Sequence, residues 1–323
     1  FKRSWIKHLV AEGTPPILPD PRPQPKLDVS PDPVPESISG FSCSIPASMW
    51  PAGEAAAKKR LRWFASNAIT DYKVSRDIPS LDGTSRLSPH LASGSVSPRQ
   101  CLAAALVANA ASTSPFDTGP AGIVQWISEL IWREFYVAVM VGFPRVARHR
   151  AFKPATERIR WNDNPAHLQA WKAGQTGVPI VDAGMRQLQG EGWMHNRVRM
   201  ITAMYFSKNL FLDWRLGEKH FMLNLIDGSL ASNNGGWQWS ASTGTDAAPY
   251  FRIFNPVTQS ERFDEAGDYI RKWVPELARV QGDAIHDPSR LPVLLRSTLD
   301  YPDMLVDLST SRAAAIEAFK AAP

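Results

Sequence analysis

The sequence predicts an all-α protein. Most segments after residue 50 show the 3.6-residue apolar periodicity of helices, and proline or glycine stands near their ends. The chain shows no convincing series of alternating strands and no fixed-period repeat. Its 323 residues suffice for one large or two modest domains with a sizeable core.

Seven segments carry helix signals. Ser88-Pro89 and Ser97-Pro98 each offer a capping side chain followed by a proline at the first helical position. Gly142 and Pro144 end the longest amphipathic segment. The expected helices are 54–66, 88–94, 98–111, 122–141, 181–190, 193–211 and 217–227. Long functional loops are expected at 71–88 and 228–256.

Residues 14–40 are too dense in proline for a helix or a central strand. We therefore expect a proline-rich interdomain connector over 1–40 and a helical domain over 41–323. The chain begins at Phe1 without an initiator Met, which suggests a fragment of a longer protein.

Composition narrows the function classes. With 44% hydrophobic and 21% charged residues the chain has the balance of a soluble globular protein, and no apolar run is long enough to span a bilayer. Two cysteines cannot form a disulfide framework, and seven scattered histidines do not suggest a metal site. A net charge of +5 permits a polyanionic partner without proving one. No P-loop, HExxH or GxSxG motif is present, although residue types alone leave a Ser/His/Asp hydrolase open.

Two expected helices carry unusual faces. Trp126, Glu129, Trp132, Arg133 and Tyr136 fall within one sector of about 120° on the helix 122–141. That face is either an i,i+4 ion pair between Glu129 and Arg133 over packed aromatics, or the wall of a cavity.

The helix 193–211 mixes polar and apolar side chains on one face, formed by Trp193, Asn196, Arg197, Met200 and Met204. Methionines are usually core residues, but a buried Asn or Arg needs a partner, which a polar ligand would supply.

Two glycine-bearing segments add candidate binding elements. The segment 82–89 sets hydroxyls and a guanidinium before a helix start, where backbone N–H groups suit a phosphate. The segment 225–239 contains Gly235 and Gly236, which permit close backbone approach, beside two tryptophans.

Four motifs, in order, resemble the flavin domain of the photolyase/cryptochrome family. They are Asp71-Tyr72-Lys73 with Arg76-Asp77, then 84–89 (TSRLSP), 192–197 (GWMHNR) and 237–247 (WQWSASTGTDA). The resemblance covers roughly residues 58–277 and is closest to the class I cyclobutane-pyrimidine-dimer (CPD) DNA photolyases. It implies a helical FAD-binding domain whose N-terminal α/β antenna domain, carrying folate or deazaflavin, is absent from this chain.

The resemblance assigns a U-shaped FAD to the helical domain. It places Asn233 near the flavin N5 and pairs Arg199 with Asp227. Ser229 stands where relatives often carry an acidic residue. The implied FAD contacts are Tyr72, Thr84, Ser85, Arg86, Leu87, Ser88, Trp126, Glu129, Arg133, Trp193, Asn196, Arg199, Asp227, Ser229 and Asn233.

The resemblance also implies catalytic and substrate roles. Trp237, Trp214 and Trp161 align with a relay that carries an electron to photoexcited flavin, and Glu129 and Asn233 are the other implied catalytic residues. The implied contacts to the lesion and the DNA backbone are Glu129, Trp132, Asn196, Arg197, Met200, Trp239 and Arg252.

The activity implied is light-driven repair of a flipped-out dimer by excited reduced FAD. A (6-4) photolyase is expected to have His in place of Asn196 and Met200, and a cryptochrome photoreceptor without repair activity is the alternative. We expect damaged DNA as the partner, a monomer, a bacterial cytoplasmic location near the nucleoid, no membrane and no metal.

Overall fold

The computed structural model is helical, which confirms the predicted all-α class. It describes residues 1–323 except 15, 18–21, 23, 24, 26, 27, 31, 34, 36, 37, 41–44, 113, 115, 246–251, 322 and 323. Within this described part the only extended pairing is an isolated bridge between Asn162 and Leu212. The α-helices are α1 (Lys2–Glu12), α2 (Glu54–Asn67), α3 (Tyr72–Ser75), α4 (Ser88–Ser93), α5 (Pro98–Ala108), α6 (Ala121–Gly142), α7 (Pro165–Ala173), α8 (Pro179–Glu191), α9 (Asn196–Met204), α10 (Trp214–Asn224), α11 (Leu230–Ser240), α12 (Pro256–Phe263), α13 (Asp268–Trp273), α14 (Val293–Arg296) and α15 (Leu308–Ala321).

Short turns join these helices. A π-helical turn, η4 (Tyr205–Asn209), continues α9 without a break. The 3-10 turns are η1 (Ala47–Met49), η2 (Val146–Arg148), η3 (Pro154–Arg158), η5 (Pro275–Leu277), η6 (Gly282–Ile285) and η7 (Pro288–Arg290).

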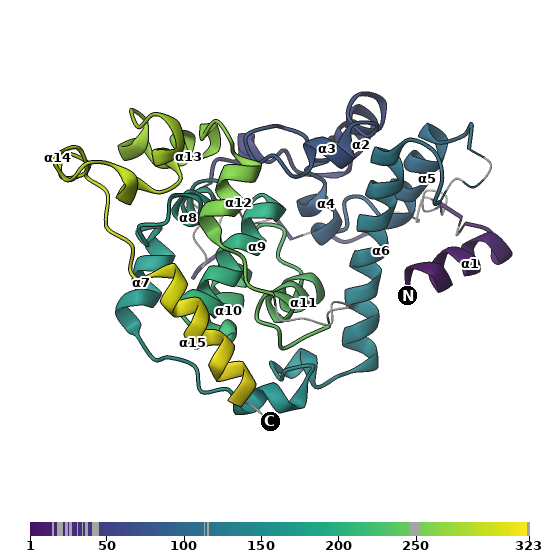
Figure 1. Ribbon diagram of the computed structural model, residues 1–323. Helices are drawn as coiled ribbons and strands as arrows, with labels where there is room; N and C mark the ends of the chain where they lie inside the picture. The colour runs from purple at the N-terminus through teal and green to yellow at the C-terminus, as the bar shows by residue number, and fades with distance from the viewer. Residues whose placement is uncertain are drawn as a thin grey trace.

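The helices pack around two apolar cores. One core gathers side chains of α2, α5 and α6 around Phe64 and Ile127. The other gathers α7 to α11 and α13 around Trp171 and Trp214, which are completely buried. Figure 1 shows α2 to α6 grouped on one side of the molecule and α7 to α15 on the other.

Helix α6 connects the two halves because two glycines make room for close neighbours, a backbone at one and an aromatic ring at the other. A Cβ added at Gly122 would lie 2.1 Å from the carbonyl oxygen of Thr70, just before α3. On α11, a Cβ at Gly235 would lie 2.1 Å from the ring of Tyr136 on α6. Larger residues at these two glycines would force the helices apart, so α6 stands close to both α3 and α11.

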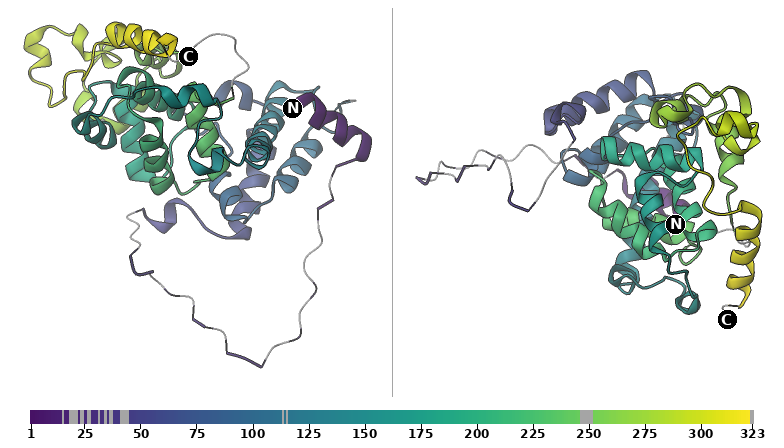
Figure 2. Two further views of the ribbon diagram at one scale, coloured as in Figure 1. Left: turned by 90° about the horizontal axis from the view of Figure 1, so that it is seen from below. Right: turned by 90° about the vertical axis from the view of Figure 1, so that its left-hand side faces the viewer.

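Helix α1 opens the segment that was expected to be a connector. Leu9 is buried in the first core, and Lys2 Nζ donates to Ser128 Oγ of α6 at 2.6 Å. Figures 1 and 2 show α1 beside α6. Much of the predicted linker 14–40 lies outside the described residues, and those that are described form no helix.

The prediction of a long loop over 228–256 is wrong, because α11 occupies residues 230–240. Glycine disfavours a helix by about 1 kcal/mol per residue, so Gly235 and Gly236 oppose this helix locally. Packing of α11 against α6, α9 and α10 overrides this preference. Residues 246–251 of the same segment lie outside the described residues.

The other predicted segments contain helices with shifted ends. The expected loop 71–88 is irregular apart from the single turn of α3, and 193–211 divides into α9 and η4. Several helices were not foreseen, namely α1, α7, α12, α13, α14 and α15.

Candidate functional site

A cavity of about 1290 Å³ lies between the two cores. Its walls come from α6, α9, α11 and the segment 84–88. It brings together most residues singled out from the sequence: Tyr72, Thr84, Ser85, Arg86, Leu87, Ser88, Trp126, Glu129, Trp132, Arg133, Trp193, Asn196, Arg199, Met200, Asp227, Ser229, Asn233, Trp237, Trp239 and Arg252. Arg197, Trp214 and Trp161 are not part of its lining.

The segment 84–88 is held in place from behind. Arg60 on α2 donates from Nε to the Ser85 carbonyl oxygen at 2.8 Å and from Nη2 to that of Thr84 at 2.9 Å. At the other end, Trp193 Nε1 donates to Ser88 Oγ at 3.2 Å. Arg86 has a φ of +50°, which few non-glycine residues adopt, and its guanidinium lies 5.3 Å from the Trp193 ring. The result is a fixed group of hydroxyls and backbone atoms at the start of α4.

Glu129 is paired across the cavity with Arg76, the residue that directly follows α3. Its Oε1 accepts from Arg76 Nη1 in an ion pair and from Gln125 Nε2 at 2.7 Å. Arg133, which was one possible i,i+4 partner, instead contacts Glu134 at 3.0 Å. The face of α6 is therefore a cavity wall, and the proposed pair between Glu129 and Arg133 is not formed.

Arg199 and Asp227 form the ion pair that the resemblance implies. Arg199 Nη2 lies 2.8 Å from Asp227 Oδ2 and 3.1 Å from Oδ1, and its Nε donates to the Met194 carbonyl oxygen at 2.8 Å. The Asp227 side chain is only 3% exposed. Three directional contacts thus fix a charged pair in the cavity wall.

A neutral histidine begins the helix that carries Arg199. Burial lowers the pKa of His195 to about 4, so its ring is uncharged at neutral pH. Nδ1 can then accept from the Arg197 N–H at 3.2 Å as a helix cap. On the same helix, Asn196 Nδ2 lies 3.9 Å from Met200 Sδ, and both side chains line the cavity, whereas Met204 is buried in the core.

Asn233 has a fixed amide. Its Nδ2 donates to the backbone oxygen of Glu218 at 2.9 Å and to Glu218 Oε1 at 3.1 Å. Because both of these partners are acceptors, the NH₂ group must face Glu218, and Oδ1 is left as the group that Asn233 offers elsewhere. Burial raises the pKa of Glu218, while His149 and Asn233 act in the opposite direction.

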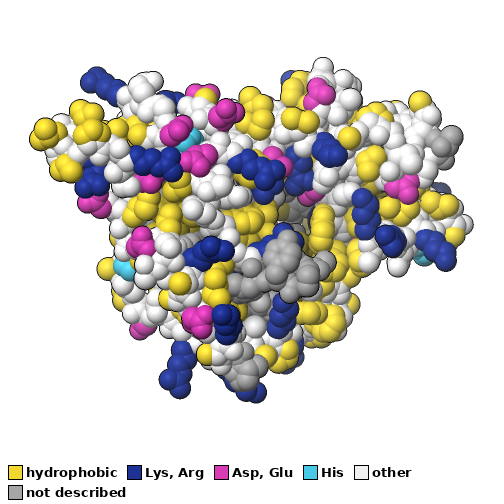
Figure 3. Space-filling view, in the orientation of Figure 1, with side chains coloured by type: hydrophobic (Ala, Val, Ile, Leu, Met, Phe, Trp, Pro, Cys, Tyr) yellow, Lys and Arg dark blue, Asp and Glu magenta, His cyan; other side chains and the backbone are white. Residues whose placement is uncertain are grey.

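Aromatic rings stand at the outer part of the cavity. Trp132 is 51% exposed although its ring contacts those of Phe135 and Tyr136. The guanidinium of Arg252 lies 5.7 Å from the Trp239 ring. Flat rings beside a cation suit a base and its phosphate. On the face shown in Figure 3, Lys and Arg side chains gather around the centre and along the lower edge.

The three predicted relay tryptophans all belong to the second core. Trp237 is 2% exposed and Trp214 is completely buried, while Trp161 is partly buried. The rings in contact with Trp237 include Trp171, whose centroid is 6.0 Å away. Trp161 contacts Phe211 and the Phe319 ring of α15.

Arg197, expected at a DNA phosphate, makes other contacts. Its Nη2 lies 2.8 Å from Asp77 Oδ1, and its guanidinium lies 4.2 Å from the Phe263 ring. The ion pair with Asp77 keeps the Arg197 guanidinium out of the cavity lining. A phosphate would have to compete with Asp77 for it.

Reasoning from the sequence assigned no role to Arg76, Gln125 or Glu218. Arg76 belongs to the first of the four family motifs. Its place four residues after Tyr72 is the one signal that could have marked it as a site residue. Gln125 lies one turn before Glu129 on α6, a spacing that is equally common in ordinary helices. Glu218 gave no signal, because its contact to Asn233 depends on how α10 packs against α11.

The cavity fits a dinucleotide cofactor. Ligand pockets commonly measure about 300–1,000 Å³, and this one is larger. The hydroxyls of the segment 84–88 and the start of α4 lie at one part of the cavity wall. The indole rings and the ion pair Arg199–Asp227 lie at another part. Among the residues that the structure describes, the buried Trp237 Nε1 has no hydrogen-bond partner. Within the described residues no His, Cys, Asp or Glu cluster suited to a metal is found, and no helix is both long and apolar enough to cross a membrane.

Comparison with known proteins agrees with this geometry. Residues 126–321 match the family model described as the FAD binding domain of DNA photolyase. The chain is 48% identical over 322 residues to the deoxyribodipyrimidine photo-lyase of Salmonella typhimurium, covering 100% of this chain and 67% of that protein.

Two solved structures are also similar. A bacterial class III photolyase from Agrobacterium tumefaciens superposes with a TM-score of 0.78 at 39% identity, covering 85% of this chain and 57% of that one. A cryptochrome from Synechocystis sp. PCC6803 gives 0.76 at 32% identity, covering 83% and 56%. This chain therefore spans little more than half the length of these structures and about two thirds of the Salmonella protein. By its sequence, its helical fold and its cavity, the chain belongs to the photolyase/cryptochrome family and contains that family's FAD-binding domain.

Proposed function

We propose that this chain is the catalytic part of a deoxyribodipyrimidine photo-lyase that repairs cyclobutane pyrimidine dimers in DNA. One observation carries the proposal. A single cavity joins residues suited to a flavin dinucleotide, such as Asn233 and the pair Arg199–Asp227, to residues suited to a pyrimidine dimer, such as Glu129 and Trp132.

The inner residues would hold FAD. Thr84, Ser85 and Ser88 offer hydroxyls to the diphosphate beside the start of α4. Asn233 presents its amide oxygen because Glu218 engages its NH₂ group. When bound in its fully reduced form, FAD supplies, on excitation by light, the electron that opens the cyclobutane ring and takes it back afterwards.

The outer residues would hold the dimer. Trp132 and Trp239 offer flat surfaces to a flipped-out lesion, as base-flipping enzymes require. Glu129 would hydrogen-bond the base edge, and its ion pair with Arg76 holds the carboxylate in place until the lesion arrives. Arg252 and Arg197 would contact phosphates, and for Arg197 this requires release from Asp77.

The buried tryptophans would serve a separate step. Trp237 lines the cavity and is buried in the second core, so it can connect the cofactor to the protein interior. Trp214 and Trp161 would continue the relay towards the surface. An antenna chromophore on a further N-terminal domain, a monomeric state and a cytoplasmic location stay predictions.

The deciding experiment is illumination of ultraviolet-damaged oligo(dT) with the reduced, FAD-loaded chain. We expect recovery of thymine monomers in the light and none in the dark. Glu129→Ala should lower the yield while the protein retains its flavin. Protein that takes up no FAD would contradict the proposal at its first step.

The similarity to the Synechocystis cryptochrome favours a second candidate, a flavin photoreceptor. That function requires the flavin cavity but no ordered lesion site. Bound and photoreducible flavin with no monomer recovery at any DNA concentration would favour the photoreceptor over the repair enzyme.

A further inference from the structure

His149 holds an unusual backbone conformation beside the site. Its φ is +56°, in the left-handed region that L-residues seldom adopt, at the end of η2. The backbone is anchored there because Arg215 Nε donates to the His149 carbonyl oxygen at 2.7 Å. Such outliers persist only where the surroundings hold them, and they are concentrated at functional sites.

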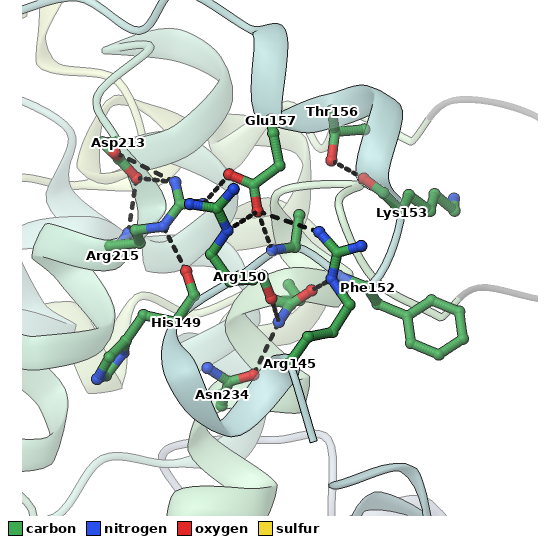
Figure 4. Close-up of polar contacts among 12 residues, drawn as sticks. Arg145, His149, Arg150, Phe152, Lys153, Thr156, Glu157, Asp213, Arg215 and Asn234 are labelled. Carbon is green, nitrogen blue, oxygen red and sulfur yellow. Dashed lines mark hydrogen bonds and ion pairs between the residues drawn. The ribbon is translucent and has the colours of Figure 1, made fainter. Parts of the chain in front are cut away.

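The anchor is part of a network of permanent charges. Arg215 also contacts Glu157 at 2.8 Å and Asp213 at 3.2 Å, and Glu157 further contacts Arg145 and Arg150. Figure 4 shows this cluster, with the imidazole of His149 pointing away from it. The network therefore fixes the backbone at His149 and leaves its ring for another partner.

That partner is the buried carboxylate behind Asn233. His149 Nδ1 lies 3.6 Å from Glu218 Oε2, and Glu218 Oε1 accepts from Asn233 Nδ2 at 3.1 Å. The two side chains of this contact differ in exposure: that of His149 is 59% exposed and that of Glu218 is 2% exposed. Glu218 thus connects an imidazole in contact with solvent to an amide that lines the cavity.

The loop that carries His149 is also fastened to α11. Gln238 Oε1 accepts from the Phe152 N–H at 2.7 Å, and Gln238 Nε2 contacts the Arg150 carbonyl oxygen at 3.3 Å. Lys153 N donates to the Thr243 carbonyl oxygen at 2.9 Å. These hydrogen bonds hold the loop against α11, which itself packs on the helix α10 that carries Glu218.

The other charged groups around this chain of contacts pair with one another, because Arg145, Arg150 and Arg215 contact Glu157 and Asp213. The imidazole of His149 is the basic group that faces Glu218 from the loop, and the neutral amide of Asn233 faces it from α11.

We propose that His149 is a positioning residue whose contact with Glu218 sets the charge behind Asn233 and so tunes the flavin pocket. A charged imidazole balances the Glu218 carboxylate, which then accepts from Asn233 and fixes the amide oxygen toward the cofactor. An uncharged imidazole leaves a buried carboxylate without a countercharge, which is costly and opposes the addition of an electron nearby. The link to the cofactor rests on the function proposed above.

The first test measures the midpoint potential of bound flavin in two variants and in the unmodified protein. His149→Lys carries a permanent positive charge beside Glu218, and His149→Gln carries none. We expect the potential of the Gln variant to lie below that of the Lys variant. A purely structural role would shift both variants in the same direction, which would overturn the proposal.

His8→Gln is the matched control. His8 also pairs with a glutamate, Glu12, at 3.2 Å, but both side chains are well exposed. In the His8→Gln variant, the midpoint potential of bound flavin should equal that of the unmodified protein. A change equal to that of His149→Gln would show a general surface-charge effect and would overturn the proposal.

The second test needs no cofactor. Infrared difference spectra against Glu218→Gln report protonation of the Glu218 carboxyl in the flavin-free chain. His149 lowers the pKa of Glu218, so His149→Gln should move this protonation to higher pH, and His8→Gln should not. Protonation at the same pH with and without His149 would refute the coupling, whereas failure to bind flavin would refute only the proposed function.

Discussion

Gly217 on α10 makes room for the indole of Trp237, and this close approach can be tested by adding one methyl group. A Cβ at residue 217 would lie 2.1 Å from Cη2 of Trp237, 2.5 Å from Cζ3 and 2.8 Å from Cζ2. The indole cannot easily turn away, because Trp171, Phe206 and Phe221 surround it. Gly217→Ala must therefore displace α10 or the indole.

The magnitude follows from two opposing effects. Overpacking a dense core costs about 1–3 kcal/mol, and contacts as short as these place the variant near the upper end. Replacing glycine by alanine inside a helix returns up to about 1 kcal/mol. We expect Gly217→Ala to lower the free energy of unfolding by about 2 kcal/mol.

Urea unfolding followed by circular dichroism measures the change, provided that the m-value stays constant. Gly236→Ala is the control, because Gly236 lies inside α11 with nothing within 4 Å of its added Cβ, so that variant should be neutral or slightly more stable. Trp237→Phe removes the atoms that clash. In that background Gly217→Ala should cost little, which gives a coupling energy of about 2 kcal/mol. An equal loss in both backgrounds would refute the close-approach argument.

Three further predictions concern the site and the core. Trp237→Phe should block photoreduction of oxidised flavin but spare repair by protein that is already reduced; transient absorption and the dimer assay measure the two effects, and loss of both would remove its relay role. DNA affinity should fall steeply with salt, and Arg252→Gln should reduce the log–log slope by about one if Arg252 contacts a phosphate; an unchanged slope counts against that contact. Burial raises the pKa of Asp182 to about 6 from 3.8, so its contribution to stability is complete below about pH 4 and is lost as the pH rises through 6. The stability advantage of the unmodified protein over Asp182→Asn should therefore shrink from pH 4 to 7 by up to about 3 kcal/mol, and a constant difference would show that the four hydrogen bonds to Asp182 cancel the effect of burial.

The long helices could be predicted because their signals are local. Ser97 and Gln100 form the capping box that begins α5, and the apolar pattern of α6 ends at Gly142 as expected. Helices such as α7 and α12 were missed although Asn164 and Asn255 cap them. They are short, so little periodicity accumulates over them.

The sequence predicted which residues belong to the site better than it predicted which of them contact one another. Most of the singled-out residues line one cavity, because the resemblance to the family assigned them together to the flavin and its substrate. The sequence suggested Arg133 as the partner of Glu129, but Arg76, which follows α3, takes that place. Spacing along one helix shows which neighbours could pair with a side chain. It does not show whether a residue from another part of the chain will pack closer and take that place.

The sequence by itself determined the helical class, the family and the set of residues around the cavity. These depend on periodicity, caps and contiguous motifs, all of which are written within short stretches of chain. Only the tertiary structure decided that 230–240 is a helix, that Arg197 is held by Asp77, and that His149 reaches Glu218. Each of these results depends on contacts between segments far apart in the sequence, whose free energy exceeds the local preferences that a sequence displays.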